Sequence, residues 1–181
     1  IFGYVAEPEG KAAAADMVQP PTISAKQAIL IDGKSGEALF EKNADEKGYP
    51  ASTTKIMTAL VTLDICEQIG AGIDTTVKIP AEAVGVEGSS LYLKKGEERT
   101  LENLLYGVML RSGNDGATAL AAIMGGNTEH FVQLMNEKAE KLGCTGTNFV
   151  NPSGLYDDNH YTTARDLATI AKEAMQNKIF R

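Results

Sequence analysis

A serine and a lysine three residues apart, Ser52 and Lys55, form the first pair in the sequence that could do chemistry. A serine hydroxyl is a poor nucleophile at neutral pH and needs a base within hydrogen-bond reach. Residues three apart on a helix share a face, so Lys55 can reach Ser52, and a helix N-terminus favours negative charge on the serine oxygen. Lysine can act as that base where burial or a nearby cation removes its proton. The spacing therefore allows nucleophilic catalysis, and the alternative is Ser52 as an ordinary helix N-cap.

A second polar cluster, Ser112-Gly113-Asn114, follows downstream in a loop between two helical stretches. A short Ser-x-Asn sequence on a loop can direct two hydrogen-bonding side chains into one cleft. The alternative is a plain helix cap and turn, because Ser, Gly, Asn and the following Asp115 all favour such positions. Together, however, Ser-x-x-Lys and Ser-x-Asn match the signature of penicillin-binding proteins and class A β-lactamases, in which Lys-Thr-Gly comes later.

Two strands are predicted near the start of the domain. Apolar residues favour strands at 27–32 and 37–41, and the turn residues 33–36 join them into a β-hairpin. Few strands are expected after residue 95, and residues 97–99 are interpreted as a solvated turn. Two strands cannot form an independent sheet with a well-covered face, so we expect further strands beyond Arg181.

Helices are predicted to hold both polar motifs. Apolar residues at helical spacing predict helices that start after Ser52, at Leu101, after Asn114, after Thr128 and near Ala164. Gly70 is predicted to cap the first helix at its C-terminus, and Thr100 and Thr163 are predicted N-caps. Ser52 is therefore expected at the N-terminal boundary of the first helix, and Ser112-Gly113-Asn114 between the second and the third.

The composition suits one globular domain. The chain has 181 residues, of which 43% are hydrophobic, enough to form a core. Its net charge of -7, without a cluster of lysine and arginine, excludes nucleic acid as a partner. No apolar run approaches the ~20 residues that span a bilayer.

The cysteines and histidines are not spaced as metal ligands. Cys66 and Cys144 are interpreted as two small, semi-buried apolar side chains, and the alternative is a single disulfide between them. His130 and His160 lie far apart in the sequence, and solvated or capping roles are expected for both. The sequence therefore predicts no metal site.

Five segments, taken in order, resemble the low-molecular-mass serine D-Ala-D-Ala carboxypeptidases among the penicillin-binding proteins. They are residues 49–60, 88–93, 112–115, 148–155 and 160–167. The resemblance covers roughly residues 22–181 and implies the α/β fold of serine β-lactamases and penicillin-binding proteins. That fold has a helical subdomain and an antiparallel sheet, whose C-terminal strands would be missing here. We therefore expect a flexible segment at 1–21 and the N-terminal part of a transpeptidase-like carboxypeptidase domain at 22–181.

The resemblance also implies a mechanism and a place of action. Ser52 would attack the penultimate D-alanine of a peptidoglycan stem peptide, and Lys55 would take the serine proton. Ser112 would relay a proton to the leaving amine, Asn114 would bind the substrate amide, and the backbone N–H of Ser52 would supply half of an oxyanion hole. β-Lactams would trap the same serine, and no cofactor is implied. The protein would act in the bacterial cell envelope, outside the cytoplasmic membrane, with membrane association only through a C-terminal region not present here.

The third motif, Lys-Thr-Gly, is absent. The triplet Cys144-Thr145-Gly146 lacks the lysine and comes too early, so we interpret it as part of a helix-to-loop passage. In relatives the Lys-Thr-Gly strand binds the substrate carboxylate and comes well after the equivalent of Arg181. Its absence leaves open whether a chain of this length is active.

Two alternatives to the carboxypeptidase remain. A class A β-lactamase needs a glutamate on a loop after Ser-x-Asn, but the matching residues 147–155 contain no carboxylate. A penicillin-binding sensor module without turnover would also lack the third motif. The residues after Arg181 discriminate between the enzyme and the sensor, because a Lys-Thr-Gly strand there would support the enzyme.

Overall fold

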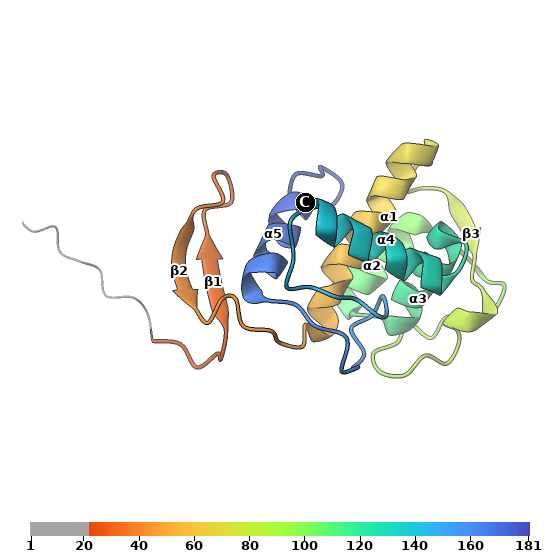
Figure 1. Ribbon diagram of the computed structural model, residues 1–181. Coiled ribbons are helices and arrows are strands. Elements are labelled where there is room, and N and C mark those ends of the chain that lie inside the picture. The colour runs from red at the N-terminus through yellow and green to blue at the C-terminus, as the bar shows by residue number, and fades with distance from the viewer. Residues whose placement is uncertain (1–21) are drawn as a thin grey trace, which may run out of the picture.

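The computed structural model describes residues 22–181 (Figure 1). In chain order the elements are β1 (Ala28–Ile31), β2 (Ala38–Lys42), the 3-10 helix η1 (Ala51–Thr54), α1 (Lys55–Ile69), β3 (Thr76–Lys78), the 3-10 helix η2 (Ala81–Ala83), β4 (Glu98–Thr100), α2 (Leu101–Arg111), α3 (Asn114–Gly125), α4 (Thr128–Lys141) and α5 (Ala164–Ala174). The segment 1–21, predicted to be flexible, lies outside the described residues.

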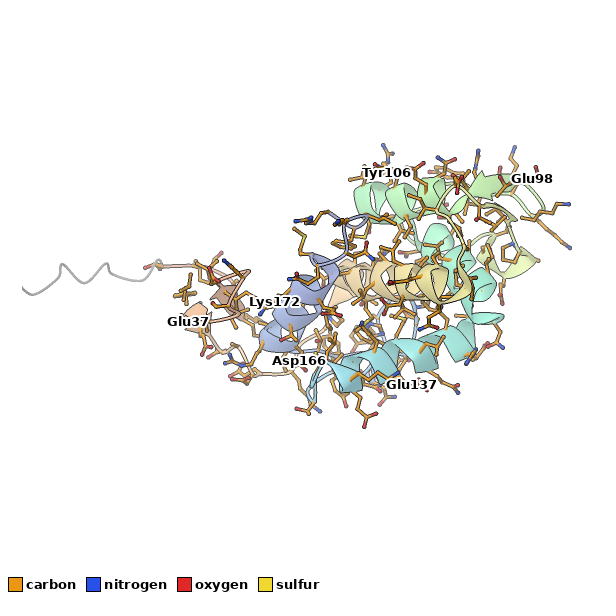
Figure 2. The ribbon with its side chains drawn as sticks, turned by 90° about the horizontal axis from the view of Figure 1, so that it is seen from above. Glu37, Glu98, Tyr106, Glu137, Asp166 and Lys172 are labelled. Atoms are coloured by element: carbon orange, nitrogen blue, oxygen red, sulfur yellow. The ribbon has the colours of Figure 1, made fainter. Side chains whose placement is uncertain are left out.

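Helix α1 forms the centre of the molecule, with α2 and α4 on opposite sides of it in Figure 2, where Tyr106 marks α2 and Glu137 marks α4. Its side chains divide between two apolar clusters. Ala59 and Leu63 pack with α2 and α3, whereas Leu60 and Val61 pack with α4 and α5. A helix that buries apolar residues around most of its circumference belongs in a core, so α1 is the rigid support on which the polar motifs can be fixed.

The helix boundaries follow the capping residues. Gly70 ends α1 in a left-handed conformation with φ 67°, which costs glycine little because it has no Cβ. Thr100 and Thr163 accept hydrogen bonds from the backbone N–H groups of Asn103 and Asp166, as N-caps do. These three predicted caps are confirmed.

The two strands predicted first form an antiparallel hairpin, in which Leu30 pairs with Phe40. The connecting turn is held by Asp32, whose Oδ1 accepts hydrogen bonds from the N–H groups of Lys34 and Ser35. The hairpin lies at one end of the molecule, beside α5 (Figure 1). Leu30 and Leu39 are more than half exposed, at 56% and 62%. The expectation of further strands beyond Arg181 stays a prediction.

Arg165 joins this hairpin region to the helices. From the first turn of α5, its guanidinium forms a two-bond ion pair with Asp45, at 2.7 and 3.0 Å, and a further bond with Glu41 of β2 at 2.7 Å. The planar fork of an arginine suits such a bidentate pair, which adds geometric precision to a contact between distant segments.

A second small sheet, β3 paired with β4, was not predicted. Residues 97–99 were expected to form a solvated turn, but Glu98–Thr100 is a strand, so that expectation is wrong. The sequence of this strand lacks the alternation of apolar and polar residues that predicts a strand, because Glu98 and Arg99 are both exposed. The pairing with β3 is made by backbone groups. Among residues 22–181, the structure has no helix with the length and apolar character needed to cross a membrane.

Leu120 of α3 provides a test of this core. It is completely buried in the cluster that α1, α2 and α3 share, whereas Leu110 at the end of α2 is 75% exposed. Leu120→Ala is expected to lower the free energy of unfolding by about 2–5 kcal/mol, because it removes buried apolar contacts and leaves a cavity. Leu110→Ala is the matched control and is expected to change it by less than about 0.5 kcal/mol. Equal effects in urea denaturation would contradict this packing.

Candidate active site

Ser52 lies in the 3-10 turn η1, which runs directly into α1. Its side chain is exposed, whereas Lys55, the first residue of α1, is only 2% exposed. Ala51, just before Ser52, has a positive φ of 48°, which is rare for a residue with a Cβ. Such strain persists only where surrounding contacts hold the backbone, and it is frequent at functional sites. The structure therefore confirms the predicted helix boundary. The strained backbone of Ala51 indicates that contacts with other segments hold this boundary in place.

The Lys55 ammonium joins three segments of the chain. Its Nζ donates hydrogen bonds to Ser52 Oγ at 3.1 Å, to Asn114 Oδ1 at 2.7 Å and to the Ser153 carbonyl oxygen at 2.7 Å. All three acceptors are uncharged, and none of the ion pairs among residues 22–181 involves Lys55. Burial without a carboxylate partner lowers the pKa of Lys55 to about 8. A lysine with this pKa can be neutral in a useful fraction of molecules near neutral pH.

Ser112 reaches Ser52 from the other polar motif. Its Oγ donates a hydrogen bond to Ser52 Oγ at 2.9 Å, across 60 residues of sequence. Ser112 is the C-cap of α2 and has a left-handed backbone with φ 56°. It is therefore, after Ala51, the second residue of the site with a strained backbone. The predicted meeting of Ser52, Lys55 and Ser112 is thus observed as a continuous chain of hydrogen bonds.

Asn114, the first residue of α3, is buried between this chain of hydrogen bonds and the preceding loop. Its Oδ1 accepts from Lys55, and its Nδ2 donates to the Glu87 carbonyl oxygen at 2.7 Å. Its backbone N–H donates to the Ser89 carbonyl oxygen at 2.7 Å. The side-chain amide therefore orients Lys55. Binding of a substrate amide by Asn114 stays a prediction.

Asp115 holds the loop that closes over this motif. Its carboxylate is 1% exposed and accepts hydrogen bonds from Ser90 Oγ and from the N–H groups of Leu91 and Leu93. Burial by itself would raise the pKa of Asp115, but these hydrogen bonds to the ionised form outweigh it and lower that pKa. Asp115 was expected only as a turn residue. Its position directly after Ser-x-Asn gave no sign of the loop that it binds.

The segment 148–155 forms the third side of the site. Besides the Ser153 carbonyl that accepts from Lys55, the Pro152 carbonyl oxygen accepts from Thr58 Oγ1 on α1 at 2.6 Å. Gly154 has φ 84°, and a Cβ at this position would overlap the carbonyl oxygen of Ala51. Motif spacing did not identify Ser153 or Gly154 as part of the site. The only sequence signal for them was the resemblance of their segment to the family.

His160 is not solvated, so that expectation is wrong. Its ring is 2% exposed, its Nε2 lies 2.8 Å from Thr54 Oγ1, and its Nδ1 accepts from the Val150 N–H at 3.2 Å. Burial lowers the pKa of His160. His130 is exposed and lies at the start of α4, where its backbone N–H donates to the Asn127 cap. The expected position near a helix cap is therefore found for His130 only.

Both cysteines are free and buried, which confirms the interpretation as apolar side chains over the disulfide alternative. Burial raises the pKa of the Cys144 thiol to about 12. The triplet Cys144-Thr145-Gly146 lies just after α4, and the Gly146 N–H donates to Asp166 of α5 at 2.8 Å. It is a helix-to-loop passage, as interpreted from the sequence.

The fold around this hydrogen-bonded Ser–Lys–Ser cluster is that of penicillin-binding proteins and serine β-lactamases. A D-alanyl-D-alanine carboxypeptidase DacD from Francisella tularensis has the same fold, with a TM-score of 0.85 and 35% identity over 96% of this chain and 43% of that one. Penicillin binding protein 5 from Haemophilus influenzae aligns with a TM-score of 0.83 and 36% identity, over 88% of this chain and 47% of that one.

The chain belongs to the peptidase S11 family of D-alanyl-D-alanine carboxypeptidases, whose family model matches residues 14–181. It is 40% identical to the D-alanyl-D-alanine carboxypeptidase DacF of Bacillus subtilis, over 84% of this chain and 39% of the relative. It is 42% identical to DacC of Escherichia coli, over 88% of this chain and 42% of the relative. The chain thus spans less than half the length of these curated relatives.

Gly154 and Gly143 provide a matched test of the contact beneath Ser52. Both have positive φ, 84° and 77°, but a Cβ at Gly143 would meet nothing within 4 Å. Gly154→Ala is therefore expected to displace the Ala51 carbonyl and to lower the free energy of unfolding by at least about 1 kcal/mol more than Gly143→Ala does, because it adds overlap with the backbone to the strain of a positive φ. Gly143→Ala carries the backbone strain alone and is the matched control. Equal losses in urea denaturation would contradict this account.

Proposed function

We propose that the full-length protein is a serine D-Ala-D-Ala carboxypeptidase that removes the terminal D-alanine from peptidoglycan stem peptides through an acyl-enzyme on Ser52. The observation that carries the proposal is the Lys55 Nζ, 3.1 Å from Ser52 Oγ, buried and without a carboxylate partner among the described residues. Such a lysine can hold or release a proton near neutral pH, which is what a base for serine requires.

In the acylation step, Ser52 Oγ attacks the carbonyl carbon of the penultimate D-alanine while neutral Lys55 takes the hydroxyl proton. The tetrahedral intermediate collapses to an ester on Ser52 and expels the amine of the terminal D-alanine. That amine takes a proton through Ser112, whose hydroxyl is 2.9 Å from Ser52 Oγ. Lys55 supplies the proton, so the site returns to neutral charge.

In the deacylation step, a water molecule attacks the ester and Lys55 acts again as base. The water proton passes to the departing Ser52 oxygen, and the shortened peptide leaves as a carboxylic acid. A β-lactam would form the same ester on Ser52 because its strained amide replaces the D-Ala-D-Ala bond. The unused second proton of the Asn114 amide is suited to bind the acyl side of either molecule, alongside its bonds to Lys55 and Glu87.

Residues 22–181 would then be the N-terminal part of the catalytic domain, and a Lys-Thr-Gly strand that binds the substrate carboxylate would follow Arg181. With peptidoglycan as its substrate, the enzyme would act outside the cytoplasmic membrane of a bacterium, in cell-wall metabolism, with any membrane anchor in a C-terminal region. Support for a carboxypeptidase over a β-lactamase comes from the names of the curated relatives and from residues 147–155, which contain no carboxylate. A sensor module would be acylated without releasing D-alanine, so product release separates it from the enzyme.

Ser52 and Lys55 can be tested by labelling the full-length protein with fluorescent penicillin. Ser52→Ala is expected to abolish labelling, because the ester has no oxygen to form on. Lys55→Ala is expected to slow labelling by about 10²–10⁴-fold, the usual contribution of a general base. Lys141→Ala, an exposed lysine on α4, is the control and is expected to label at the wild-type rate. Equal labelling of wild type and Ser52→Ala would show that Ser52 is not the nucleophile.

The pH dependence of acylation follows from Lys55. Only the neutral amine can accept the serine proton, and burial lowers the pKa of Lys55 to about 8. The acylation rate is therefore expected to rise about tenfold per pH unit below 8 and to level off above it, because the neutral fraction grows until most molecules are deprotonated. Stopped-flow acylation by a chromogenic β-lactam from pH 6 to 10 measures this. A rate that falls as pH rises through 8 would contradict Lys55 as the base.

A further inference from the structure

His160 connects a distant loop to the turn that carries Ser52. Its ring is buried against Phe149, with the two ring centroids 5.6 Å apart in an edge arrangement. One ring nitrogen, Nε2, is 2.8 Å from Thr54 Oγ1, and the other, Nδ1, is 3.2 Å from the backbone nitrogen of Val150. Thr54 is separated from His160 by 106 residues of sequence and lies between Ser52 and Lys55. The ring therefore touches the one buried residue between the two reacting groups.

The two contacts are compatible with one state of the imidazole. The Val150 N–H can only donate, so Nδ1 must present a lone pair. In a neutral ring the proton is then on Nε2, which donates to the Thr54 hydroxyl oxygen. A protonated ring would carry N–H groups on both nitrogens, and its Nδ1–H would face the Val150 N–H donor to donor. Protonation of His160 thus breaks one contact and disturbs the position of the ring that makes the other.

The Thr54 hydroxyl is part of the contact surface beneath Ser52. Its Oγ1 also lies against Gly154, the residue that closely approaches the Ala51 carbonyl. Ala51 and Thr54 are the two ends of η1, so Gly154 and His160 together contact both ends of this turn. A shift of about 1 Å in such a turn is enough to slow a reaction about 100-fold, because reacting groups must be held close and aligned.

Few charges act on the ring. Burial is the main cause that lowers its pKa, and Asp157, in the loop before it, raises that pKa in part. Lys55, next to Thr54 at the start of α1, directs its ammonium to Ser52, Asn114 and Ser153. Lys47 lies over the ring of the neighbouring Tyr161, 3.9 Å from its centroid. The folded protein therefore favours the neutral ring that the hydrogen bonds require.

We infer that neutral His160 is a positioning residue for acylation, which holds the Ser52 turn through its Nε2–Thr54 hydrogen bond, and that protonation of His160 releases this turn. The inference rests on the proposed function of Ser52 for its kinetic readout. The acylation rate then depends on the protonation state of two groups, Lys55 and His160. Lys55 must lose its proton to act as base, and His160 must have lost its own for Ser52 and Lys55 to be aligned.

Substitution of His160 by glutamine and by leucine in the full-length protein tests the inference. Glutamine carries an amide oxygen that can accept from Val150 and an N–H that can donate to Thr54, but it does not titrate. Leucine keeps the volume and loses both hydrogen bonds. At pH 7.5 we expect His160→Gln to react with fluorescent penicillin within about threefold of wild type, and His160→Leu to react at least about tenfold more slowly. His130→Gln, at the exposed histidine, is the control with no expected change.

The pH profile separates positioning from a general loss of stability. The pKa of His160 is lowered from 6.5, so the midpoint of its protonation in the folded protein lies below that pH. As pH falls from 7.5 to 4.5, the rate of His160→Gln relative to wild type is expected to rise, because wild type alone loses its aligned turn. A relative rate that stays constant over this range would overturn the inference, as would wild-type reactivity of His160→Leu at pH 7.5.

Nitrogen-15 NMR of histidine-labelled protein gives an answer that does not depend on activity. With His130→Gln used for assignment, the His160 ring is expected as the Nε2–H tautomer, titrating below 6.5. The Nδ1–H tautomer, or titration at 6.5 or above, would overturn the inference. If wild type did not react with penicillin at all, the proposed function would fail, and the NMR result would still decide the state of His160.

Discussion

The placement of the Lys55 ammonium is the interaction on which the rest of the site depends. Its three acceptors come from η1, from the start of α3 and from the loop 148–155, so segments separated by up to 98 residues meet at one nitrogen. Burial of an amine is costly unless its hydrogen bonds are satisfied. Oxygen atoms of Ser52, Asn114 and Ser153 satisfy them without adding a negative charge. A carboxylate in place of any of these would stabilise the ammonium and raise the pKa of Lys55.

The scaffold around this nitrogen is arranged to keep it in place. Helix α1 is packed on both sides by apolar clusters, so its first residue cannot shift without disturbing the core. Ser112 and Asn114 lie at the junction of α2 and α3, and Asp115 ties that junction to the loop at 90–93. The polar site is therefore built on helix termini whose positions are set by apolar packing, which is more exact than a site carried by loops alone.

The opposite side of the turn that carries Ser52 is held by a single segment, residues 148–160. It supplies the Ser153 carbonyl to Lys55, the close approach of Gly154 to Ala51, and the hydrogen bond of His160 to Thr54. Positive φ at Ala51 is tolerated because these contacts over-determine the backbone of the turn. The proposed acyl transfer requires such a preorganised serine, since alignment before reaction lowers the barrier.

Local sequence was enough to predict the helices, the β1–β2 hairpin, the caps at Gly70, Thr100 and Thr163, and the pairing of Ser52 with Lys55. Each of these depends on residues a few positions apart, where periodicity, turn chemistry and helical spacing act directly. The joining of Ser112 and Asn114 to that pair was predicted from the motif, but its geometry was not. Tertiary structure alone decided the contacts of Ser153, Gly154 and His160 and the pairing of β3 with β4. These contacts join residues far apart in sequence, or backbone groups common to every residue, so no side-chain pattern along the chain encodes them.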